Sequence, residues 1–202
     1  MFSDNGFSFK KSTQALNFFA KKENDTLDKM KALKLIYFSD RYHLRKYGRT
    51  LTNDEYFAMS FGPVASGTKD LIEMSNFLDN DEKLYVQSYL LPIPNTNNIK
   101  SIREIEMDEL SASELETLNY IWEKLGSMSN FDLAELSHQY PEWKRYEERL
   151  KLGLVTRIRM DLSDFFDDPI GDLEKFYVLK PEEKEAKIYY LKELHKIESL
   201  WN

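Results

Sequence analysis

The sequence contains no cysteine, which excludes disulfide bonds, thiol catalysis and zinc sites built from thiolates. It also lacks the run of about 18 consecutive apolar residues that a membrane-spanning helix requires. The N-terminal stretch MFSDNGFSFKKS has no apolar segment of the length found in signal peptides. We therefore expect a cytoplasmic protein that does not associate with a membrane.

Apolar residues are plentiful, by contrast. They make up 42% of the 202 residues and include 13 Phe, 12 Tyr and 3 Trp. This is enough material for a hydrophobic core, so global disorder is not expected. The length suits one compact domain, or one domain with an appendage.

The net charge of −7 is unevenly distributed along the chain. Residues 1–100 carry 14 Lys/Arg and 12 Asp/Glu, residues 101–160 carry 8 and 12, and residues 161–202 carry 6 and 11. An acidic second half argues against broad binding to a phosphate backbone, and no basic recognition helix is evident, so we do not expect direct DNA binding. The acidic surface is either simply solvated or steers a basic partner.

Periodicity and capping residues indicate the secondary structure. They predict helices over residues 12–22, 27–47, 64–78, 111–125, 129–138 and 181–200, with a further helical turn at 141–143. Strands are predicted over 56–59, 83–91 and 99–105, the last two as a hairpin across the turn-rich segment 92–98. Because strands do not alternate with long crossover helices, we expect a predominantly helical α+β fold with about six helices and a small antiparallel sheet.

The predicted helix 27–47 carries a charge on its apolar side and ends at Gly48. Asp40 lies in the apolar stripe, and burying an unpaired carboxylate costs roughly several kcal/mol. We expect its partners to come from Gly62, Pro63 and Val64 or from the start of the following helix, so that Asp40 fixes a loop to its own helix. The alternative is a catalytic carboxylate.

The Gly-Pro turn is predicted to serve backbone geometry. The segment 62–67 matches neither a phosphate-binding loop nor a nucleophile elbow. Gly62 is expected to adopt a positive φ or to allow a close approach, and Pro63 is expected at the start of the next helix.

His43 lies three residues after Asp40, on the same face of the helix. Two such side chains are too few to hold a metal ion, so we expect neither a metal nor a cofactor. We expect His43 to bond a backbone carbonyl or Asp40. A hydrolase that uses Asp40, His43 and Arg41 is kept as an alternative.

The three arginines Arg41, Arg45 and Arg49 follow one another at a spacing of four residues. Such a ladder on an exposed face would grip carboxylates or phosphates, and we take Arg45, Arg49 and Tyr42 as candidate partner contacts. Local pairing with acidic residues is the other interpretation. Trp143, which follows a proline and a glutamate, is predicted to lie in the core.

Taken together, these segments resemble the Panacea antitoxin domain family. The resemblance is carried by KLIYFSDRYHL at 34–44, YG at 47–48, Thr52, YFAM at 56–59, GPV at 62–64 and Ser66, then by residues 110–125, LAELSH at 133–138 and PEWK at 141–144. The order and spacing fit over about residues 15–150. Members of this family are often found on phages and other mobile elements.

The resemblance implies a non-enzymatic protein that binds and silences a toxin encoded beside it. Residues 1–150 would form the Panacea-like domain, and residues 151–202 an acidic extension packed on it. The scaffold residues would be Asp40, Arg41, His43, Gly48, Gly62, Pro63, Val64 and Trp143. A mobile-element adaptor that binds a host protein is the alternative, and the identity of the toxin, its contact surface and the oligomeric state remain open.

Overall fold

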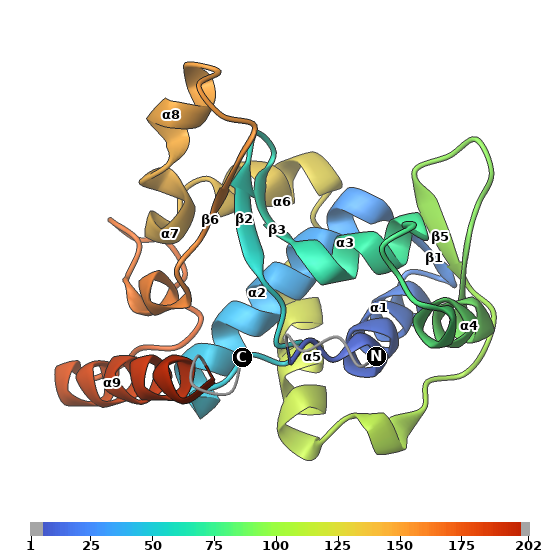
Figure 1. The fold of residues 1–202 in the computed structure, drawn as a ribbon, viewed down its shortest axis with the longest axis horizontal. Coiled ribbons are helices and arrows are strands. Elements are labelled where there is room, and N and C mark those ends of the chain that lie inside the picture. The colour runs from blue at the N-terminus through green and yellow to red at the C-terminus, as the bar shows by residue number, and fades with distance from the viewer. Residues whose placement is uncertain (1–5, 199–202) are drawn as a thin grey trace.

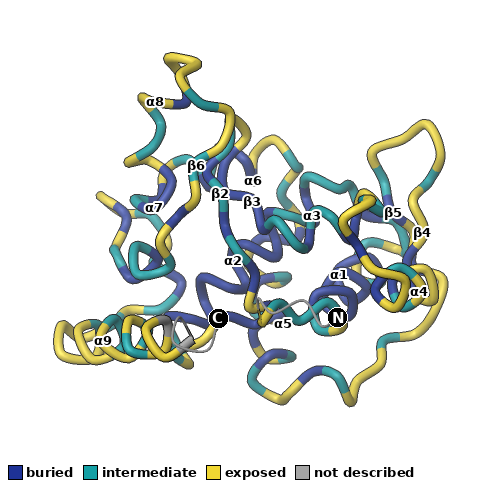
Figure 2. Tube along the Cα trace, in the orientation of Figure 1, coloured by how far each residue is buried: buried dark blue, intermediate teal, exposed yellow. Residues whose placement is uncertain are grey.

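Helix α2 (Lys29–Tyr47) crosses the middle of the molecule and is buried along most of its length (Figures 1 and 2). The computed structural model describes residues 6–198, so residues 199 and 200 of the predicted closing helix lie outside the described residues. Asp28 caps α2 by accepting a hydrogen bond of 3.0 Å from the Lys31 N–H. Gly48 ends it with a φ of +81°, as predicted for a glycine that follows a helix.

The prediction of a predominantly helical α+β fold is confirmed. Besides α2, the described residues form eight α-helices: α1 (Phe9–Lys22), α3 (Ser66–Glu73), α4 (Asn80–Tyr89), α5 (Ala112–Leu125), α6 (Asn130–Ser137), α7 (Pro141–Lys144), α8 (Glu147–Lys151) and α9 (Pro181–Glu198). Two 3-10 helices, η1 (Met107–Glu109) and η2 (Leu162–Phe166), complete the helical elements described. The count exceeds six mainly because short helical turns after residue 140 form separate elements. Among the described residues, no helix combines the length and apolar character needed to cross a membrane.

Two small antiparallel sheets flank α2. One has the order β1 (Thr26–Asp28), β5 (Asn98–Ser101), β4 (Leu90–Pro92). Strands β4 and β5 pair as a hairpin across the predicted turn, but β4 begins only at Leu90, near the end of the predicted strand 83–91. The other has the order β3 (Gly62–Ala65), β2 (Tyr56–Met59), β6 (Arg157–Arg159). Because β6 pairs with β2, the chain after residue 150 joins the same sheet as the Gly-Pro turn.

Two predictions of secondary structure were wrong, one for residues 83–91 and one for Pro63. Residues 83–91 were expected as a strand, but a capping box between Asp79 and Glu82 starts helix α4, and the helical spacing buries Val86 and Tyr89 on one face. Pro63 was expected to open a helix, but it lies in strand β3 opposite Ala58. A proline is tolerated there because β3 is at the edge of its sheet.

The core forms where α1, α5, α6 and β3 pack around α2. The C-terminal part contributes to it directly. The ring of Phe165 in η2 meets the rings of Tyr37 and Tyr56 edge-on, with centroids 5.7 and 5.2 Å apart. Residues of the expected extension 151–202 thus share a core with α2, while the division at residue 150 stays a prediction.

Candidate functional site

Asp40 is fully buried, and its carboxylate accepts four hydrogen bonds. The backbone N–H groups of Leu51 and Thr52 donate to Oδ1 at 2.6 and 3.0 Å, while the hydroxyls of Thr52 and Tyr56 donate to Oδ2, the latter at 2.8 Å. Burial raises the pKa of Asp40, and these four donors oppose that rise by favouring the charged form.

The expected source of these donors was wrong. Neither the Gly62 turn nor the helix after it supplies them. The chain reverses at Gly48, and residues 51–56 therefore pass Asp40 before the hairpin begins. The prediction that Asp40 ties a loop to α2 fits the contacts, although a different loop is tied.

A second buried carboxylate, Asp54, was not predicted from the sequence. It accepts hydrogen bonds from the N–H groups of Gly67 and Thr68, at 2.8 and 2.7 Å, and from the Thr68 hydroxyl at 2.8 Å. These donors lie at the start of α3, where backbone N–H groups are free. Burial raises the pKa of Asp54 to about 6. No local spacing in the sequence reveals this contact, because its two sides are separated by the whole β2–β3 hairpin.

The predicted exposed arginine ladder was wrong for two of its members. Arg41 and Arg45 are fully buried. The Arg41 Nε donates to Glu142 at 2.7 Å, and its two terminal nitrogens donate to the carbonyls of Asp167 and Lys175 at 2.8 and 3.1 Å. The planar fork of a guanidinium suits such a set of fixed acceptors.

Arg45 holds the same C-terminal segment from the next turn of α2. It donates to the carbonyls of Tyr177, Phe165 and Asp167 at 2.9, 3.1 and 3.3 Å and pairs with the carboxylate of Asp168. The segment from residue 165 to residue 177 therefore folds over both guanidiniums. This burial makes Arg45 inaccessible as a partner contact in the described structure.

The other two candidate contacts differ in exposure. Tyr42 is 5% exposed and stacks on Tyr120 with ring centroids 4.5 Å apart, so its expected accessibility was also wrong. Arg49 has a half-exposed side chain and pairs with the buried Glu114 at 2.7 Å. A partner contact through Arg49 stays a prediction.

Asp40, Arg41 and His43 point to three different places. His43 bonds the Arg49 carbonyl through Nδ1 at 2.8 Å, as predicted, and the Ser113 hydroxyl through Nε2 at 3.2 Å. The three side chains share a helix but not a cleft, so the alternative of a hydrolase built on them has no supporting geometry. Within residues 6–198, no group of three or more His, Asp or Glu side chains is arranged to hold a metal ion.

The Gly62 turn packs tightly against α2 and the end of α6. Gly62 has a φ of +98°, and a Cβ there would lie 2.3 Å from the Ser137 hydroxyl and 2.7 Å from the Lys34 Nζ. Glycine is therefore required at position 62, both by the positive φ and by the lack of room for a Cβ. Next to it, Trp143 is 3% exposed, stacks on His138 and donates from Nε1 to the Met59 carbonyl at 2.9 Å.

Lys34 is the most unusual charge of this region. It is 1% exposed, and its ammonium donates one hydrogen bond, of 2.8 Å, to the Pro63 carbonyl. Among the ion pairs of the described residues, none involves Lys34. Burial lowers the pKa of Lys34 to about 7.

This lowered pKa predicts a pH-dependent stability. Between pH 7 and 10.5 the unfolded chain keeps a proton on Lys34 that the native protein has lost, so the free energy of unfolding should rise with pH, by up to about 1.4 kcal/mol per pH unit. Lys34→Met should remove this rise. The variant should exceed the unsubstituted protein in free energy of unfolding by the largest amount at or below pH 7. Urea unfolding at pH 6.5, 8 and 9.5 tests this. Lys100→Met, which alters an exposed strand lysine, is the control, and equal pH profiles for all three proteins would contradict the prediction.

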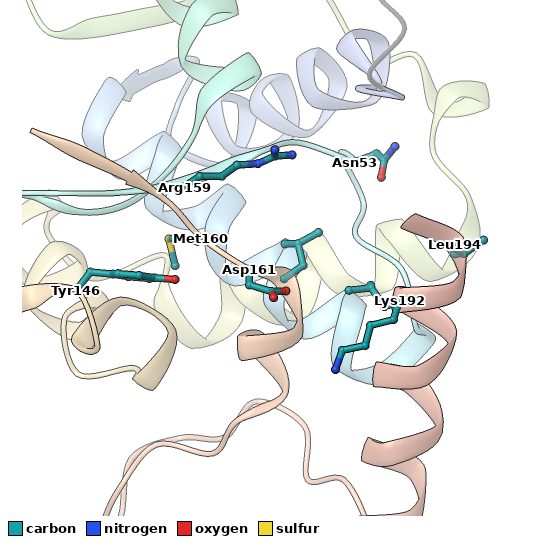
Figure 3. Close-up of a pocket in the computed structure, with 9 residues that line it drawn as sticks. Asn53, Tyr146, Arg159, Met160, Asp161, Lys192 and Leu194 are labelled. Atoms are coloured by element: carbon teal, nitrogen blue, oxygen red, sulfur yellow. The ribbon is translucent and has the colours of Figure 1, made fainter. Parts of the chain in front are cut away.

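A pocket of about 490 Å³ lies between β6, the start of η2 and helix α9 (Figure 3). Met160, Leu162 and Leu191 form part of its apolar lining, and Arg159 and Lys192 add cations on its two sides. Arg159 is already paired with Glu55 at 2.6 Å. Asp161 and Tyr146 also line the pocket, so its surface mixes apolar, acidic and basic side chains.

The chain matches the model of one protein family, described as "Antitoxin SocA-like, Panacea domain", over residues 33–144. This is more than half of the chain, and the protein belongs to that family. No curated protein and no solved structure gave a significant match. The matched range contains most of α2, the β2–β3 hairpin and α5 to α7, whereas β6, η2 and α9 lie beyond it.

Proposed function

We propose that this SocA-like Panacea protein is a cytoplasmic antitoxin that neutralises a cognate toxin by binding it directly. The observation that carries the proposal is the family match over residues 33–144, which covers most of α2 and the contacts of Asp40 with residues 51–56. The role requires a stable scaffold and an accessible surface. It requires no cofactor.

The contacts of α2 support the proposal that this region serves as a stable scaffold. Asp40, Arg41 and Arg45 all make hydrogen bonds inside the protein, to backbone groups and to side chains that include the Tyr56 hydroxyl and the carboxylates of Glu142 and Asp168. Charges satisfied in this way fix loops and are not free to meet a substrate. We propose the same scaffold role for His43, Gly48, Gly62, Pro63, Val64 and Trp143.

Exposed apolar side chains support the proposal that the protein binds a partner. Phe61, Leu152 and Leu154 are each about two-thirds exposed, and so is Tyr189 on the separate helix α9. Single exposed apolar residues are ordinary, but several large ones on neighbouring elements mark contact surfaces.

Co-expression with the product of the adjacent gene tests the proposal. We expect that product alone to arrest growth, and co-expression of this protein to restore growth and yield a complex that co-purifies. If neutralisation occurs by binding, it should be complete at a fixed molar ratio of antitoxin to toxin when purified antitoxin is titrated into toxin. An enzyme would act at a small fraction of that ratio, and such a result, or the absence of a complex, would count against the proposal.

A further inference from the structure

The turn between β2 and β3 lies beside the segment that follows α8, at one end of the molecule (Figure 1). We name this end the hairpin-tip surface and define it as Ser60, Phe61 and residues 149–157. The pairing of Met59 with Arg157 brings its two parts together. A pocket of about 130 Å³ lies between them, lined by Ser60, Leu150 and Lys151 together with His138, Trp143 and Glu147.

The residues of the hairpin-tip surface are basic in an acidic protein, although two glutamates, Glu147 and Glu148, directly precede them on α8. Residues 149–157, RLKLGLVTR, contain three cations and no carboxylate, whereas the whole chain carries −7. Arg149, Lys151 and Arg157 are all exposed. Lys151 is paired with Glu147 at 2.8 Å, and Arg157 lies over the ring of Phe57. Such a concentration of one sign favours contact with the opposite sign.

The same surface exposes large apolar side chains. Gly153 has a φ of +67° and turns the chain so that Leu152 and Leu154 stand on either side of it, 67% and 68% exposed. Phe61 is 66% exposed on the neighbouring turn. Apolar groups that cost free energy in water, set among cations, are the usual composition of a protein contact with an apolar centre and a charged rim.

We infer that the hairpin-tip surface binds an acidic segment of the partner protein and receives an apolar side chain of it beside Phe61, Leu152 and Leu154. The cations select the charge of the segment, and the adjacent pocket of about 130 Å³ has room for a single side chain. The leucines cannot hydrogen-bond to bases, which favours protein over nucleic acid. This inference rests on the proposed function, because it takes the neutralised toxin as the partner. It also differs from the expectation based on net charge, in which the acidic half meets a basic partner.

Two double variants test the inference with purified protein and the purified product of the adjacent gene. Leu152→Ser/Leu154→Ser removes the apolar centre, and Arg149→Glu/Arg157→Glu reverses the charge. Each should weaken binding at least tenfold in calorimetry while leaving the thermal unfolding temperature nearly unchanged. Salt should weaken binding of the unsubstituted protein, and the charge-reversed variant should lose this dependence.

Matched control variants make the same kinds of substitution on another part of the surface. Leu84→Ser/Leu91→Ser and Lys83→Glu/Lys100→Glu change residues on α4, β4 and β5 and should bind normally. If the unsubstituted protein binds and both hairpin-tip variants bind equally well, the inference is wrong while the proposed function stands. Loss of binding in Tyr189→Ser/Tyr190→Ser alone would assign the contact to α9 and overturn it as well. If the unsubstituted protein fails to bind the toxin, both fall.

Two further probes test the competing ligands of a basic apolar surface. The unsubstituted protein is sedimented with vesicles containing anionic lipid and titrated with single-stranded RNA. We expect neither to bind. Binding of either one that the hairpin-tip variants lose would assign the surface to that ligand and overturn the inference.

Discussion

Replacing Asp40 by Ala should lower the free energy of unfolding by several kcal/mol, which is a large share of the roughly 5–15 kcal/mol that stabilises a typical domain. The substitution leaves two backbone N–H groups and the hydroxyls of Thr52 and Tyr56 without their acceptor. Each buried donor left unpaired costs about 1–3 kcal/mol. Because residues 51–56 lead directly into β2, loss of these bonds should also loosen the β2–β3 hairpin.

The variant Asp40→Asn separates the effect of losing the negative charge from the effect of losing side-chain volume. The amide keeps the size of the side chain, but its NH₂ group would face donors where the carboxylate offered oxygen. We therefore expect Asn to destabilise nearly as much as Ala. Urea unfolding followed by circular dichroism measures both, with Asp172→Asn, at an exposed position, as the control. A variant at Asp40 with full stability and lost toxin neutralisation would contradict the scaffold role and point to a functional carboxylate.

The fold class, most helices and the position of Asp40 could be predicted because they follow from local signals. Capping boxes such as Ser111 with Glu114, and the 3.6-residue spacing of apolar side chains, act within a few positions of the chain. Asp40 stood out because a carboxylate in an apolar stripe must have partners. The same reasoning could not name those partners, because they depend on where the chain runs after Gly48.

The arginine ladder shows why exposure is harder to predict. Four-residue spacing places Arg41 and Arg45 on one face of α2, but spacing does not say what covers that face. It is covered by residues 165–177, more than a hundred positions away, whose backbone carbonyls match the guanidinium donors. Those carbonyls have no signature in the sequence, since every residue has one. Asp54 was missed for the same reason, because its partners are backbone N–H groups.

Removing one partner of the buried pair Arg41–Glu142 should be as damaging as losing Asp40. Both side chains are fully buried, with Nε and Oε1 2.7 Å apart, and the Tyr37 hydroxyl donates to the same oxygen at 2.6 Å. Burial and the nearby Glu142 raise the pKa of Tyr37 well above its ordinary value, so it stays a donor. Arg41→Met would leave the buried Glu142 carboxyl group without its cationic partner, and we expect a loss of about 3–5 kcal/mol.

A double-mutant cycle distinguishes the pair from its surroundings. Arg41→Met and Glu142→Gln should each destabilise, and the double variant should lose clearly less than the sum, because it leaves no lone buried charge. Arg41 also donates to the carbonyls of Asp167 and Lys175, so part of its effect should persist in the double variant as faster hydrogen exchange across residues 165–177. Lys144→Met, an exposed substitution two residues after Glu142, is the control. Simple additivity would mean that Arg41 acts by holding the C-terminal segment over α2 and not by neutralising Glu142.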